Sequence, residues 1–127
     1  MYDRGAWSLA EHRETSVSGI SQIDIHAART LLDDGRALFV DIRDPVSFRS
    51  GHVPGAHHLT DRTVEAFLET ADKDRPIVVY CYHGHSSLTA SAWLQQKGFS
   101  DVTSMAGGFE AWRAAYPEAT AIAPRSD

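Results

Sequence analysis

Short apolar runs alternate with segments of helical periodicity through the middle of the chain. Four runs predict strands, at residues 20–23, 38–42, 77–80 and 101–105. The run Ile77-Val78-Val79-Tyr80 is the clearest, because β-branched and aromatic residues without alternation are typical of a strand buried on both faces. The run at 38–42 is interrupted only by Asp41 and predicts a second buried strand that ends near Arg43.

Helical patterns follow these strands. Asp24 occupies an N-cap position, Ile25, Ala28 and Leu32 then share one helical face, and Gly35 supplies the stop. Three more helices are predicted. One is capped by Thr60 or Asp61 and carries Val64, Phe67 and Leu68. Another begins near Ser86 or Ser87 and stops at Gly98, and the last follows Gly107-Gly108 and carries Phe109 and Trp112.

This alternation predicts βα units, and therefore an α/β fold with a mainly parallel sheet and helices on both faces. In such sheets ligands bind beyond the carboxyl ends of the strands, which draws attention to the residues after Tyr80. A chain of 127 residues suits one domain. We expect an N-terminal extension at 1–19, a single domain at 20–117 and a C-terminal tail at 118–127.

Charge and cysteine content narrow the classes of function. The formal net charge is −5 without clustered lysine or arginine, which disfavours nucleic acid and anionic lipid as partners. No stretch approaches the ~20 apolar residues of a membrane span, and the N-terminus has no apolar run of a secretory signal. A single cysteine excludes an intrachain disulfide and a C-x-x-C pair. A cytoplasmic, reducing location is the expectation.

The residues after Tyr80 carry the candidate chemistry. A buried strand ends at Cys81, a short loop contains Gly84, and a helix begins. A glycine with positive φ lets successive amides turn inward as an anion nest, and the helix start adds unpaired N–H donors. Such donors would favour a Cys81 thiolate and hold a persulfide or a substrate oxyanion. Further donors could come from the side chains of His83, His85, Ser86 and Ser87.

The alternative for Cys81 is a purely structural role, since free cysteine is among the most buried residue types. A zinc site is disfavoured, because Cys81, His83 and His85 form too compact a set of ligands.

Four segments together resemble the rhodanese family, and the resemblance covers about residues 20–117. Asp41-Ile42-Arg43 is similar to the family's Asp-x-Arg, and residues 51–56 are similar to its Gly-His-Ile-Pro-Gly-Ala turn. Residues 81–87 stand where the active-site loop belongs, and Gly107-Gly108-Phe109-x-x-Trp112 is similar to the Gly-Gly-x-x-x-Trp ending. The order and spacing of all four make the resemblance specific.

The resemblance implies a rhodanese-like three-layer fold with a five-stranded sheet, and a double displacement. Cys81 would attack the sulfane sulfur of thiosulfate, release sulfite and become a persulfide. The loop residues Tyr82, His83, Gly84, His85, Ser86 and Ser87 would hold the anion. Cyanide, a thiol or a reduced protein dithiol would then accept the sulfur. This chemistry needs a nucleophile and an oxyanion cradle but neither a metal nor another cofactor.

This chain departs from the family pattern in two ways. Its active-site loop has no arginine or lysine, so His83 and His85 are the only potential cations, and we expect modest affinity that weakens as pH rises. Ser47 stands where many members have glutamate, so a carboxylate partner for Arg43 must come from elsewhere. We expect Asp41 and Arg43 to be supporting residues that fix loops by charged hydrogen bonds.

Two other functions compete. A cysteine-dependent phosphatase would resemble Cys-x5-Arg, but Ser87 occupies the arginine position, and the bidentate phosphate clamp is missing. A non-enzymatic rhodanese-like module, regulatory or redox-sensing, remains open, because a reactive thiol also suits a sensor. The presence of Cys81 favours the enzyme, since inactive rhodanese-like domains commonly lack the cysteine.

Overall fold

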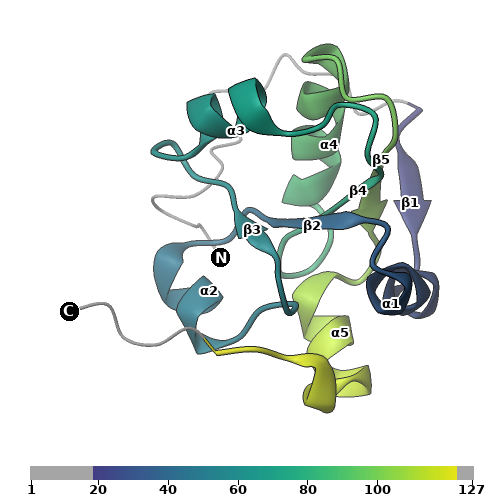
Figure 1. Ribbon diagram of the computed structural model, residues 1–127. Helices are drawn as coiled ribbons and strands as arrows, with labels where there is room; N and C mark the ends of the chain where they lie inside the picture. Colours follow the sequence, from purple (N-terminus) through teal and green to yellow (C-terminus); the bar gives the residue numbers. More distant parts are fainter. Residues whose placement is uncertain (1–18, 123–127) are drawn as a thin grey trace.

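The computed structural model describes residues 19–122 (Figure 1). Its centre is a five-stranded sheet in the order β1-β5-β4-β2-β3, in which every pairing is parallel. The strands are β1 Ser21–Ile23, β2 Leu38–Asp41, β3 His57–His58, β4 Ile77–Tyr80 and β5 Val102–Met105. The helices are α1 Ile25–Asp34, α2 Pro45–Ser50, α3 Val64–Thr70, α4 Ser86–Gln96, α5 Gly108–Ala115 and the 3-10 turn η2 Pro117–Ala119. The α/β prediction is therefore confirmed.

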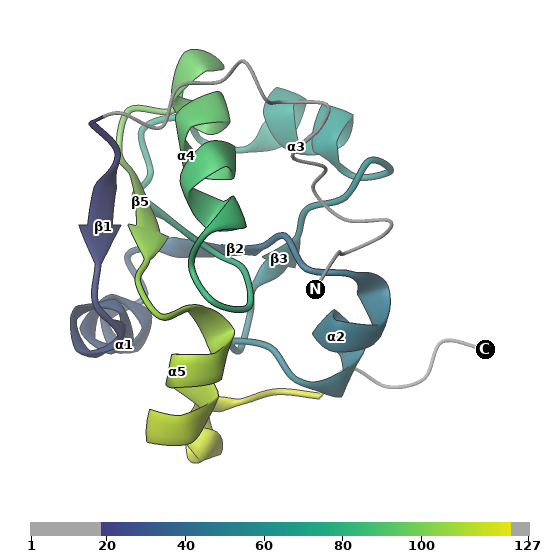
Figure 2. The same ribbon diagram turned by 180° about the vertical axis from the view of Figure 1, so that it is seen from behind.

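Helices cover both faces of the sheet, as Figures 1 and 2 show, with α3 and α4 on one side and α1 and α5 on the other. Strand β4 explains the two layers, because its side chains alternate between them. Ile77 and Val79 pack in the cluster that includes Phe67 and Leu94. Val78 and Tyr80 pack in the second cluster, on the side that holds Trp112. All four residues of β4 are buried, as the continuous apolar run predicted.

The predicted boundaries of the first helix are confirmed. The Asp24 side chain accepts a hydrogen bond from the Ala27 amide (2.8 Å), and Gly35 ends the helix in the left-handed conformation at φ 68°. The start predicted for the third helix is wrong. The helix begins at Val64 with Thr63 at the cap position, because residues 61–63 form a turn in which Thr60 donates its amide to the Thr63 hydroxyl (2.9 Å).

Three short elements escaped the sequence pattern. Helix α2 has six residues, too few to show a helical period, although Asp44 caps it and Pro45 opens it. Strand β3 has two residues, both histidines, and η2 has three. The predicted extension falls outside residues 19–122 except for Gly19. The first half of the predicted tail, residues 118–122, is described, and there Ala119 is buried and Ala121 pairs with His52. No helix among the described residues is long and apolar enough to cross a membrane.

The sheet register gathers distant segments at one edge. Asp41, the last residue of β2, lies opposite Tyr80, the last residue of β4, and Val79 lies opposite Ser104 in β5. Because the strands are parallel, the segments that follow them all leave from this carboxyl edge. Cys81, the Asp41–Arg43 segment and the start of α5 therefore meet there.

Candidate active site

Two backbone amides converge on the sulfur of Cys81. The thiol side chain follows β4 directly and is 5% exposed. Its Sγ accepts hydrogen bonds from the amides of Gly84 (3.1 Å) and Ser87 (3.3 Å). Gly84 reaches this geometry at φ 102°, a left-handed value that favours glycine, and Ser87 belongs to the first turn of α4. Amides aimed at one atom from a loop and a helix start favour negative charge on that atom.

A chain of hydroxyl groups continues behind the sulfur. The Oγ of Ser87 lies 3.4 Å from Cys81 Sγ and 2.7 Å from the Oγ of Ser104 in β5. Both serines are fully buried. Sequence reasoning found Ser87 but missed Ser104. A polar residue at a buried position of a strand was the only available signal.

The start of α5 holds the backbone of the loop. The amide of Phe109 donates to the Cys81 carbonyl (2.8 Å), and that of Glu110 donates to the Tyr82 carbonyl (3.0 Å). Figure 2 shows the loop between β4 and α4 beside this helix. Gly108 permits the approach, because it has φ +62° and a Cβ there would lie 2.4 Å from the Tyr82 oxygen. Gly108 of the Gly-Gly motif therefore serves the site by keeping a side chain out of this contact.

The remaining loop side chains point to other partners. The hydroxyl of Tyr82 accepts a hydrogen bond from Arg113 of α5 (3.1 Å), and His83 forms an ion-pair contact with Glu110 of the same helix (2.5 Å). His85 is exposed at the cap position of α4, and Ser86 is the first residue of that helix. Neither side chain hydrogen-bonds to the sulfur in the described part of the chain. The contacts to Sγ thus come from Gly84 and Ser87 alone.

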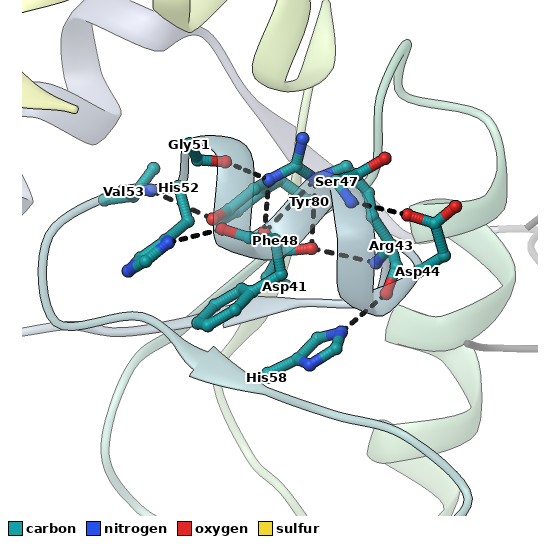
Figure 3. Close-up of polar contacts among 10 residues, drawn as sticks. All are labelled: Asp41, Arg43, Asp44, Ser47, Phe48, Gly51, His52, Val53, His58 and Tyr80. Atoms are coloured by element: carbon teal, nitrogen blue, oxygen red, sulfur yellow. Dashed lines mark hydrogen bonds and ion pairs between the residues drawn. The ribbon is translucent and has the colours of Figure 1, made fainter. Parts of the chain in front are cut away.

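Asp41 and Arg43 form a buried ion pair beside the loop (Figure 3). The carboxylate of Asp41 accepts from the Arg43 backbone amide (2.8 Å) and from its Nη2 (2.7 Å). The same Nη2 donates to the Gly51 carbonyl (2.6 Å). Burial disfavours the charged guanidinium, but the hydrogen bonds and the charge of Asp41 outweigh it, so the pKa of Arg43 is raised. Asp41 is thus the carboxylate partner that Ser47 cannot be.

Neighbouring groups extend this network around Arg43. His58 donates from Nε2 to the Arg43 carbonyl (2.6 Å), and its ring stacks on Phe48 at 4.4 Å between centroids. Tyr80 accepts a hydrogen bond from the Val53 amide (3.0 Å), as Figure 3 shows. Burial first, and then the charge of Asp41, raises the pKa of Tyr80 well above its ordinary value, so its hydroxyl stays protonated. The network ties the 43–53 segment to the end of β4.

A cavity of about 240 Å³ lies beside Tyr82. Its lining includes two arginines and no acidic residue. The lining residues are Arg43, Val46, Ser47, Ser50, Gly51, Tyr82, Phe109, Arg113 and Thr120. The cationic groups near the loop therefore come from other elements. Within residues 19–122, no three His, Cys, Asp or Glu side chains are grouped as metal ligands.

The structure is thus an α/β domain with a buried cysteine in an amide cradle at the carboxyl edge of a parallel sheet. The chain matches the rhodanese-like domain family over residues 24–115, and it belongs to that family. This confirms the resemblance drawn from the four sequence motifs.

Relatives with assigned functions are similar over most of the domain. The thiosulfate sulfurtransferase GlpE of Pseudomonas putida is 55% identical over 85 residues, which are 67% of this chain and 77% of that protein. The protein of the same name from Pseudomonas aeruginosa is 53% identical over 93 residues, 73% of this chain and 84% of the relative.

Solved structures agree on the fold. The rhodanese-like domain of the Anabaena Alr3790 protein is 27% identical, with a TM-score of 0.70 over 84% of this chain and 87% of that one. A Rhodopseudomonas palustris protein of unknown function, described as a possible tyrosine phosphatase, is 28% identical, with a TM-score of 0.69 over 91% of this chain and 96% of that one.

Proposed function

We propose that this protein is a thiosulfate sulfurtransferase that carries sulfur as a persulfide on Cys81. The observation that carries the proposal is the convergence of the Gly84 and Ser87 amides on Cys81 Sγ, at 3.1 and 3.3 Å. The similarity to the Pseudomonas GlpE proteins, named as thiosulfate sulfurtransferases, supports the substrate. The catalytic unit is the domain at residues 20–117.

The reaction has two displacements at sulfur. In the first, the Cys81 thiolate attacks the sulfane sulfur of thiosulfate, a new S–S bond forms, the S–S bond of thiosulfate breaks, and sulfite leaves with the electron pair. The negative charge then rests on the outer sulfur of the persulfide. In the second, a thiolate, a reduced protein dithiol or cyanide attacks that outer sulfur, and Cys81 leaves as the thiolate. Charge and atoms balance without a cofactor, since each step exchanges one nucleophile for another.

The remaining site residues take roles set by their contacts. Gly84 and Ser87 hold the anion through their amides, and Arg113, hydrogen-bonded to Tyr82, supplies positive charge that the loop lacks. His83 faces Glu110, which offsets any charge the imidazole carries. His83 therefore contributes less to donor binding than the loop sequence suggested.

Asp41 and Arg43 support the site through contacts with neighbouring segments. Their ion pair fixes the segment after β2, and the Arg43 guanidinium lies 4.2 Å from the ring centroid of Phe109. Since the Phe109 amide holds the Cys81 carbonyl, this packing positions the loop without touching the reacting sulfur.

We place the reaction in the cytoplasm, where a lone thiol stays reduced. Small-molecule donors and thiol acceptors are the expected partners. The net charge of −5 argues against nucleic acid and anionic membrane surfaces.

Intact-mass measurement after incubation with thiosulfate tests the proposal. We expect the mass of one added sulfur atom, its removal by cyanide with formation of thiocyanate, and no addition to Cys81→Ser. Unchanged mass across a range of thiosulfate concentrations would reject the thiosulfate donor. Cys81-dependent hydrolysis of para-nitrophenyl phosphate would favour the phosphatase instead, and a stable fold with neither activity would favour the non-enzymatic module.

A further inference from the structure

Ser104 is a buried serine with one hydrogen-bond partner. It lies in β5, is fully buried, and its Oγ is 2.7 Å from the Oγ of Ser87. In the described part of the chain, no other polar group hydrogen-bonds to it. Ser87 in turn lies 3.4 Å from Cys81 Sγ. The three atoms form a chain with two links, Sγ to Ser87 and Ser87 to Ser104.

The number of hydrogens depends on the state of the sulfur. With a thiol, the chain contains three hydrogens, one on Sγ and one on each hydroxyl, but only two links to receive them. One hydrogen is therefore left without an acceptor among the three groups, two of which, Ser87 and Ser104, are fully buried. With a thiolate, two hydrogens remain, Ser104 donates to Ser87, and Ser87 donates to the sulfur. Every donor is then satisfied, and a buried donor without a partner is the costly alternative.

We propose that Ser104 is a positioning residue that turns the Ser87 hydroxyl toward Cys81 and so favours the thiolate. The hydroxyl of Ser87 has a single hydrogen, which can point to Sγ or to Ser104. Because Ser104 has no other acceptor, its own hydrogen occupies the Ser87 oxygen and leaves the Ser87 hydrogen for the sulfur. Sγ then has three donors, two amides and one hydroxyl.

The hydrogen-bond chain from Ser104 through Ser87 to Cys81 stabilises negative charge on Sγ. Its consequence for catalysis rests on the proposed function. Persulfide formation moves the charge to the outer sulfur, and sulfur transfer returns it to Sγ as the leaving group. A donor held on Sγ by Ser104 therefore assists the second displacement. The preference for the thiolate itself does not depend on which sulfur donor the enzyme uses.

The test compares Ser104→Ala with Ser91→Ala. Ser91 is also fully buried, and within residues 19–122 its hydroxyl has no hydrogen-bond partner. The control therefore removes the same atom from a buried position outside the Ser104–Ser87–Cys81 chain. The absolute rate of Cys81 alkylation by iodoacetamide is measured against pH by intact mass. We expect Ser104→Ala to alkylate about three- to ten-fold more slowly near neutral pH, with the profile moved upward by roughly 0.5–1 pH unit and the alkaline plateau kept.

Ser91→Ala should follow the native profile, and so should Ser104→Thr, which keeps the hydroxyl. A Ser104→Ala profile with an unmoved midpoint, or an equal shift in Ser91→Ala, would overturn the proposal. A general structural defect would lower the rate at all pH values without moving the midpoint, and this outcome also counts against it. Alkylation uses no thiosulfate, so a moved midpoint in a protein that fails to take up sulfur would reject the sulfurtransferase reading alone.

Discussion

Replacing Gly108 by alanine tests how the start of α5 shapes the site. At φ +62° the new Cβ would lie 2.4 Å from the Tyr82 oxygen and 2.7 Å from the His83 nitrogen. Both are backbone atoms of the active-site loop, so no side chain can rotate away. Ordinary contact begins at 3.4 Å, so the loop and the helix must separate by about 1 Å.

This separation has a calculable cost. It would stretch the bond from the Phe109 amide to the Cys81 carbonyl from 2.8 Å to beyond hydrogen-bond range, and the Glu110 bond to the same loop likewise. Two lost hydrogen bonds cost about 1–3 kcal/mol. The left-handed backbone adds about 1–2 kcal/mol for any residue with a Cβ. The free energy of unfolding should therefore fall by about 2–5 kcal/mol.

Gly35→Ala is the matched control. Gly35 has nearly the same conformation, φ +68°, but nothing lies within 4 Å of the added Cβ, so only the backbone term of about 1–2 kcal/mol applies. Urea unfolding of both variants isolates the clash. Since an error of about 1 Å in a reacting group can cost on the order of 100-fold in rate, sulfur transfer to cyanide should fall at least about ten-fold in Gly108→Ala only. Equal stability loss and equal activity in the two variants would refute the reasoning.

Three further predictions follow from charged groups. Asp41→Asn leaves the Arg43 cation buried without a counter-charge, so the free energy of unfolding measured in urea should fall by about 3–5 kcal/mol. Adding Arg43→Met should recover part of this loss. A double variant no more stable than Asp41→Asn would contradict the prediction. Burial first, and then the charge of His58, lowers the pKa of His57. As pH falls, the unfolded chain therefore takes up a proton on His57 before the native protein does, and the free energy of unfolding decreases as pH falls through the ordinary histidine range. The His57→Phe variant should show a smaller decrease when urea unfolding is compared at about pH 7.5 and about pH 5.5. Arg113→Gln should raise the KM for thiosulfate about two- to five-fold. Added salt should raise the KM of the native protein and so reduce the difference between the two proteins. An unchanged KM in the variant would exclude Arg113 from donor binding.

Local pattern was enough to predict the main elements and the loop that contains Cys81. The run from Ile77 to Tyr80 and the cap at Asp24 each depend on neighbours within a few residues, and both appear where they were expected. The position of Cys81 between a strand and a helix, with Gly84 in the loop, is also local. The amides that reach its sulfur lie three and six residues further along the chain.

Local pattern failed where elements were too short to have a period. Helix α2, with six residues, and β3, with two, carry no repeat that distinguishes them from a loop. Helix α3 begins at Val64 because the Thr60 amide donates to the Thr63 hydroxyl in a preceding turn. The sequence alone does not reveal which of the two threonines will occupy the cap position.

Tertiary structure alone decided which groups surround the cradle. Ser104 lies 17 residues from Ser87, and Phe109 lies 28 residues from Cys81, yet each pair is in hydrogen-bond contact. The cause is the parallel pairing of β4 with β5, which brings the ends of both strands to the same edge of the sheet. The same arrangement places Arg113 beside Tyr82. The sequence by itself thus determined the position of Cys81 and the loop whose amides reach its sulfur, because those contacts are local. The pairing of the strands decided that Ser104, the start of α5 and Arg113 lie around that loop, because these residues are distant in sequence.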